Sequence, residues 1–91
     1  MYISPKYKLH EVAGEHVILI HGQKAGDLSR ILALNSTSLF LWNSLSESHF
    51  TEADAIALLT KNFEVDEQTA AKDASEWIST LKNLNIILDE Q

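Results

Sequence analysis

The sequence predicts an α+β domain with a winged-helix-like arrangement, in which a three-stranded antiparallel sheet is followed by a three-helix bundle. Two patterns support this fold class. As far as Leu34, short apolar segments alternate with turns, as they do in strands and hairpins. Beyond Asn35, apolar residues recur at spacings of three and four, which is typical of helices that bury one face. Asn35 is itself a good helix N-cap and marks the boundary.

The first two predicted strands form a hairpin, with residues 7–13 and 16–21 on either side of Gly14. The two-residue loop is either Ala13–Gly14 or Gly14–Glu15, and the sequence leaves this choice open. In both registers the same three apolar side chains share one face, because the two registers differ by two residues. These side chains are Leu9, Ile18 and Ile20. We expect their face to be the inner one.

The third predicted strand covers residues 28–34. Residues 1–6 are expected to form a loose lead-in, because Pro5 has no backbone N–H to donate to a sheet. At the other end, the apolar segment Ile86–Leu88 is expected to form either a brief last strand or a hydrophobic cover over the core. The whole chain, residues 1–91, is expected to be a single domain, since its length suits one modest core.

Each predicted helix begins at a capping residue. The first follows Asn35 and runs to about Leu45. Thr51 and Asp54 have the spacing of a capping box and begin the second, with Asp54 replacing the usual Glu. Asp66 caps the third helix.

The third predicted helix has an apolar stripe and a plausible end. Its stripe consists of Ala70, Ala74, Trp77, Ile78, Leu81 and Leu84. Asn83 and Asn85 are suitable stop residues, because Asn tolerates the left-handed conformation in which many helices end.

Composition and charge exclude several classes of protein. The chain of 91 residues is 45% hydrophobic and 22% charged, as in an ordinary globular domain. Its apolar runs are too short to span a bilayer, so no membrane partner is expected. The absence of cysteine excludes disulfides and thiolate chemistry, and the cytoplasm is the simplest compartment. A net charge of −6 disfavours nucleic acid as a partner, because phosphates would be repelled.

No catalytic or cofactor-binding motif is found. Three of the four histidines lie on the predicted hairpin, but they lack a metal-binding spacing, and His16 should point away from His10 and His21. No serine lies in a Gly-x-Ser-x-Gly motif, and there is no phosphate-binding loop or dinucleotide fingerprint. We therefore expect no enzyme activity, no catalytic residue, no metal and no cofactor.

The third predicted strand suggests a different kind of site. If residues 28–34 form an outer strand, one side of that strand presents unpaired backbone N–H and C=O groups. A peptide could then bind as a further strand, with backbone hydrogen bonds providing affinity and side-chain pockets providing specificity. The alternative is a short edge covered by the third helix, and the sequence favours neither.

Several landmarks in their order and spacing resemble the PqqD family, whose fold is also called the RiPP recognition element. They are Leu34-Asn35, Trp42, Phe50-Thr51, Phe63-Glu-Val-Asp66, Asp73, Leu81 and Ile86-Ile-Leu88. The resemblance covers roughly residues 9–88. It departs from the family after the third helix, where many members have Gly and this chain has Asn85, a residue that can still adopt a left-handed cap.

The resemblance implies a non-catalytic peptide chaperone. Such a protein binds the leader of a ribosomally made precursor peptide and presents the peptide to a modifying enzyme, often a radical SAM protein. The leader would add beside the third strand and lie against the third helix. The implied strand contacts are Ser29, Arg30, Ile31, Leu32 and Ala33. The implied helix contacts are Asp73, Trp77, Thr80, Leu81 and Leu84. Burial in the core is an equally good interpretation of Trp77 and Leu81, and Asp73 could instead hold the helix to the sheet.

Two other interpretations remain open. The first is a winged-helix regulatory or protein–protein interaction domain, although the predicted third helix is too acidic for a DNA-reading helix. Its charged residues are Asp66, Glu67, Asp73 and Glu76 against Lys72 and Lys82. The second is a homodimer in which two copies pair through the same strand edge.

Overall fold

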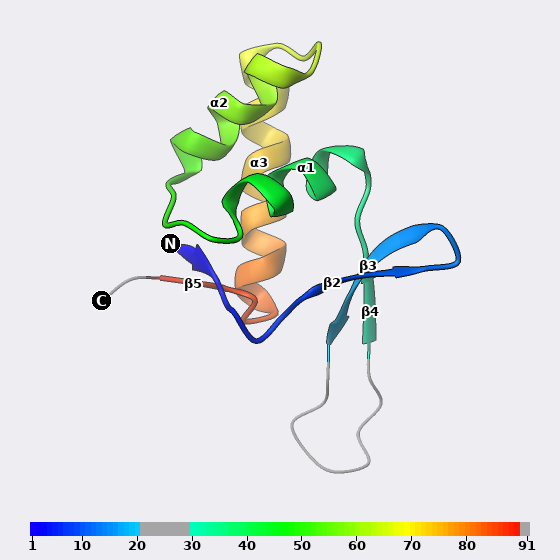
Figure 1. Ribbon diagram of the computed structural model, residues 1–91. Coiled ribbons are helices and arrows are strands. Elements are labelled where there is room, and N and C mark those ends of the chain that lie inside the picture. Colours follow the sequence, from blue (N-terminus) through cyan, green and yellow to red (C-terminus); the bar gives the residue numbers. More distant parts are fainter. Residues whose placement is uncertain (21–29, 90–91) are drawn as a thin grey trace.

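The computed structural model describes residues 1–20 and 30–89. Figure 1 shows the small sheet extending to one side of the three helices. In chain order the elements are β1 (Tyr2–Ile3), β2 (Leu9–Val12), β3 (Glu15–Ile20), β4 (Arg30–Ala33), α1 (Ser36–Leu45), α2 (Glu52–Asn62), α3 (Glu67–Asn83) and β5 (Ile87–Leu88). The predicted α+β class, with a three-stranded antiparallel sheet and three helices, is confirmed.

The β2–β3 hairpin turns at Ala13–Gly14. Val12 pairs with Glu15, so the loop between the two strands consists of Ala13 and Gly14 alone. Their φ angles are 53° and 83°, and two successive positive φ values are what a type I′ turn requires. This pairing decides between the two registers that the sequence left open. The predicted inner face is also confirmed, because Ile18 is fully buried and Leu9 and Ile20 pack against the core.

The expectation of a loose lead-in is wrong for Tyr2–Ile3. These residues form β1, which pairs antiparallel with β5, and the Ser4 amide extends the pairing by donating to the Ile86 carbonyl at 2.7 Å. Ile3 is buried in the core. The rule about proline still holds, because the strand ends before Pro5 and the missing N–H is never needed. β1 and β5 form a sheet of their own, separate from β2-β3-β4.

The predicted helix starts are confirmed. The Asn35 side chain accepts a hydrogen bond from the Ser38 amide at 2.9 Å and so caps α1. Thr51 and Asp54 form the reciprocal capping box at the start of α2, with distances of 2.9 and 3.2 Å. Each cap satisfies amides that the first turn of a helix leaves without an intrahelical partner.

The end of α3 returns the chain to the core. Asn85 adopts a φ of 60°, in the left-handed region that Asn tolerates. The Ile86 amide then donates to the Leu81 carbonyl at 2.8 Å, and the Asn85 amide donates to Lys82 at 3.0 Å. These two bonds are the Schellman motif. The reversal leads Ile86 and then β5 back under α3, where Ile86 is fully buried.

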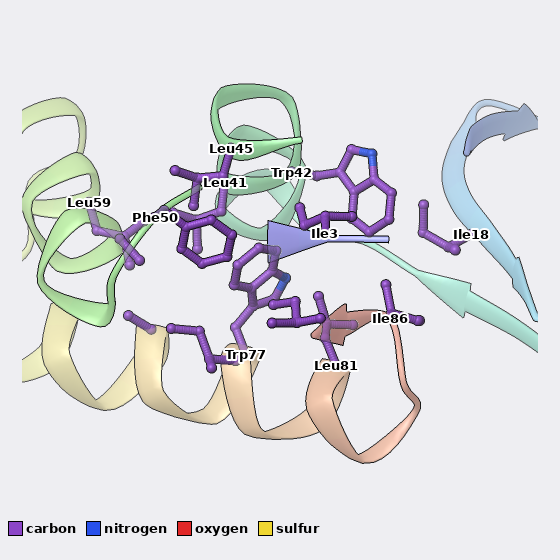
Figure 2. Packing of buried hydrophobic residues seen from close by; sticks show 14 of the residues in the cluster. Ile3, Ile18, Leu41, Trp42, Leu45, Phe50, Leu59, Trp77, Leu81 and Ile86 are labelled. Carbon is purple, nitrogen blue, oxygen red and sulfur yellow. The ribbon is translucent and has the colours of Figure 1, made fainter. Parts of the chain in front are cut away.

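The core lies between α1, α2, α3 and the β1–β5 pair. Figure 2 shows Trp77 of α3 projecting toward side chains of α1 and toward Phe50, which precedes α2. Along its length α3 packs mainly on α2, and at its end on β5. No helix in the described part of the chain is long and apolar enough to cross a membrane. This packing fixes which face of α3 is left to line a surface groove.

Asp66, the N-cap of α3, has a lowered pKa, and we expect its contribution to stability to depend on pH. Two hydrogen bonds from Thr69 hold the pKa of Asp66 below its ordinary value of 3.8. The bond from the Thr69 side chain has the larger effect, and the second comes from the Thr69 backbone amide at 2.7 Å. A lowered pKa means that the folded protein binds this proton less readily than the unfolded chain does. The stabilisation is therefore present above the unfolded pKa and is lost as pH falls through the folded pKa.

We therefore expect the stability advantage of the native chain over Asp66→Asn to shrink as the pH falls below about 5, because Asn caps the helix without titrating. Urea unfolding of both proteins across this range measures the difference. Stability curves that stay parallel would contradict the predicted role of the carboxylate.

Candidate functional site

In the described part of the chain, β4 has a neighbour on one side only. It pairs antiparallel with β3, and β2 lies beyond β3. The Leu34 amide continues this pairing by donating to the His16 carbonyl at 2.9 Å. In an antiparallel ladder, alternate residues direct both backbone groups toward the partner strand. Leu32 therefore faces β3 as Leu34 does, and the N–H and C=O groups of Ile31 and Ala33 point to the open edge.

This alternation divides the predicted strand contacts. Ile31 and Ala33 direct their backbone groups to the open edge, whereas the Leu32 backbone is occupied within the sheet. Arg30 begins the strand, and Ser29 lies outside the described residues. The side chains alternate as well, so Leu32 packs partly against the core while Ile31 is 63% exposed on the opposite face.

A groove of about 290 Å³ lies between the end of β4, the start of α1 and one face of α3. Its lining residues are Leu32, Ala33, Leu34, Asn35, Thr37, Ser38, Asp73, Glu76, Trp77, Thr80 and Leu81. The groove thus brings predicted strand and helix contacts together. Leu84, also a predicted contact, is not among the lining residues and packs partly against the core.

Trp77 and Leu81 fit both interpretations given to them. They are 9% and 1% exposed and belong to the core cluster, yet both line the groove. Their contribution to the groove is therefore a preformed apolar surface, held in place by the packing seen in Figure 2. The Trp77 indole Nε1 is buried and has no hydrogen-bond partner among the described residues. An unsatisfied buried donor of this kind costs stability, on the order of 1–3 kcal/mol.

Among the described residues of the groove lining, the charged ones are Asp73 and Glu76. Both are exposed, and neither forms a hydrogen bond or ion pair through its side chain with a described residue. The structure therefore does not show Asp73 holding α3 to the sheet. Glu76 was not among the predicted contacts. The signal for it was its helical spacing, three residues after Asp73 and four before Thr80, which places all three on one face.

The start of α1 supplies polar groups that sequence reasoning did not assign to the site. Asn35 Oδ1 accepts hydrogen bonds from the Ser38 amide and from Thr37 Oγ1 at 3.0 Å, so its acceptor already serves the helix start. A second hollow of about 420 Å³ shares Ala33, Leu34, Asn35 and Ser38 with the groove and extends toward the β2–β3 turn. Its remaining lining residues are Gly14, Glu15 and His16. The segment from β4 into α1 therefore borders two neighbouring hollows, the groove and this second one.

The described residues include no cluster of three or more His, Cys, Asp or Glu side chains that could hold a metal ion. The described site therefore offers an open strand edge, an apolar floor and two carboxylates. This arrangement is suited to holding an extended chain.

Comparisons with known proteins agree with the fold. The family model for coenzyme PQQ synthesis protein D (PqqD) matches residues 7–87. A solved structure, TbiB1 in complex with the TbiA(beta) leader peptide, has a similar fold with a TM-score of 0.73. The likeness covers 100% of this chain and 99% of that one, at 19% sequence identity. A comparison with curated proteins found no match.

Amide hydrogen exchange in the protein without ligand can test which β4 residues direct their N–H groups to the open edge. We expect the Ile31 and Ala33 amides to exchange at least about tenfold faster than those of Leu32 and Leu34, because only the latter pair donates to β3. Residue-resolved exchange measured by NMR gives the comparison. Protection of all four amides would show that the edge is already paired, for example with a second copy of the chain.

Proposed function

This chain belongs to the PqqD family, and from that premise we propose that it binds the leader of a ribosomally synthesised precursor peptide by strand addition to β4. The observation that carries the proposal is the open β4 edge, whose residues Leu32 and Ala33 line the groove. TbiB1, which shares the fold, was solved with a leader peptide.

The backbone supplies the affinity in this proposal. Ile31 and Ala33 each offer one N–H and one C=O to an added strand. Hydrogen bonds of this kind contribute about 0.5–1.5 kcal/mol each, so together they hold a peptide of any sequence weakly. Because side chains alternate along a strand, every second residue of the peptide would point into the groove. Selectivity then comes from the groove lining.

The proposed side-chain contacts are Asp73, Trp77, Thr80 and Leu81, with Glu76 added from the geometry. Arg30 and Leu84 remain predictions as contacts, and Ser29 remains one outside the described residues. Trp77 and Leu81 would contact the peptide through their groove-lining surfaces without leaving the core.

The role is that of a binding module. We propose that residues 1–91 act as a single domain without a catalytic residue, metal or cofactor, and that the chemistry belongs to a modifying enzyme of the radical SAM type. The encounter would take place in the cytoplasm, where the ribosome releases its peptide. The bound leader would fix the position of the following segment relative to that enzyme.

We expect a synthetic leader, taken from the short precursor encoded nearest this gene, to perturb the amides of Ile31 and Ala33 and of α3 residues 73–81. An NMR titration of the labelled protein detects this. Ala33→Pro should weaken binding at least about tenfold, since it removes one outward donor and blocks the edge. An edge position whose N–H faces outward tolerates proline, so the variant should still fold.

Ala33→Ser serves as the control, because it keeps the backbone donor and should bind like the native chain. Leu32→Pro is a contrasting variant. It removes a donor from the β3–β4 ladder and should destabilise the sheet itself. A folded Ala33→Pro protein with native affinity would show that the peptide does not add at this edge.

A further inference from the structure

The groove has a charge character that generic strand addition does not require. Its described lining contains two carboxylates, Asp73 and Glu76, and no Lys or Arg. Both acids are exposed and have no partner among the described residues. Lys72 precedes Asp73 directly, yet it is not part of the lining and forms no ion pair with either acid. Two like charges three residues apart on a helix repel one another, and a cation placed beside both would relieve this repulsion.

The two acids lie toward one end of the α3 face. Along the helix they precede Trp77 and Leu81, whose buried side chains form the apolar part of the lining together with Leu32. From Asp73 to Leu81 the helix rises about 12 Å, at 1.5 Å per residue. Side chains on one face of a strand are about 6.6 Å apart. A strand that runs along α3 would therefore place two successive inward side chains in the groove, one at the acidic part and one at the apolar part.

We infer that the peptide recognised by this chain carries a Lys or Arg that lies between Asp73 and Glu76, with an apolar residue two positions away against Trp77 and Leu81. This inference rests on the proposed function and adds the chemistry of the ligand to it. A basic side chain suits the site in two ways. Its head complements the carboxylates, and its aliphatic stem covers apolar surface while the head stays in water.

A selection from random ten-residue peptides, displayed and captured on the immobilised full chain, tests this inference. We expect the captured peptides to share a Lys or Arg at one position and an apolar residue two positions away. When the immobilised protein is the Asp73→Lys/Glu76→Lys variant, we expect the captured peptides to lose the basic residue and to carry Asp or Glu at that position. The control is Glu47→Lys/Glu64→Lys, which changes the net charge equally at two exposed sites outside the groove and should keep the basic preference.

A captured peptide then allows the contribution of the basic residue to the binding affinity to be measured. Replacing its shared basic residue by Glu should weaken binding to the native chain about tenfold in low salt, and the loss should shrink as salt screens the charges. The same peptide should regain affinity for the charge-reversed variant. NMR spectra of both double variants establish that they are folded.

The outcomes separate the two proposals. Captured peptides that perturb the Ile31 and Ala33 amides but show no basic preference would overturn the inference and leave the proposed function standing. A basic preference that persists unchanged in the Asp73→Lys/Glu76→Lys variant would also overturn the inference, because the acids would not be its cause. A library from which no peptide binds at the β4 edge would overturn both.

Discussion

The one-sided pairing of β4 is the constraint on which the site depends. A strand in the middle of a sheet uses all of its backbone groups, whereas an edge strand leaves alternate residues with outward N–H and C=O groups. Here β1 and β5 pair with each other in a separate sheet and do not extend β2-β3-β4. β4 ends at Ala33, and two residues later Asn35 caps α1, so the strand stays short. Within residues 1–20 and 30–89 the edge therefore stays open, beside the groove that α3 lines.

Helix packing gives the groove its shape. Because Trp77 and Leu81 are held in the core cluster, the neighbouring turns of α3 present Asp73, Glu76 and Thr80 at the surface. The same helix therefore stabilises the domain with one stripe and lines the groove with the adjacent one. A residue at the boundary between the stripes belongs to both, which is why the two interpretations of Trp77 were compatible rather than exclusive.

Local rules predicted the parts of the fold that local chemistry determines. Asn35, Thr51 and Asp66 could be recognised as caps because a cap satisfies amides within three residues of itself. β1 was not predicted because its partner strand lies at the other end of the chain and no residue near β1 in the sequence indicates the pairing. The sequence also could not predict which β4 residues face the open edge, because this depends on the register with β3, which is separated from β4 by a long connection. The family resemblance pointed to Asp73, and the assembled groove added Glu76, which lies on the same helix face.

The pairing of β1 with β5 has a consequence for the order in which the chain folds. Tyr2 pairs with Leu88, so this contact closes a loop that contains almost the entire sequence, and loops of that length carry a high closure entropy. The capped helices and the β2–β3 hairpin need only neighbouring residues and can form earlier. The groove is built from segments inside that loop. Its parts can therefore come together before the two ends of the chain meet, and a kinetic experiment would find the terminal sheet among the last elements to acquire native structure.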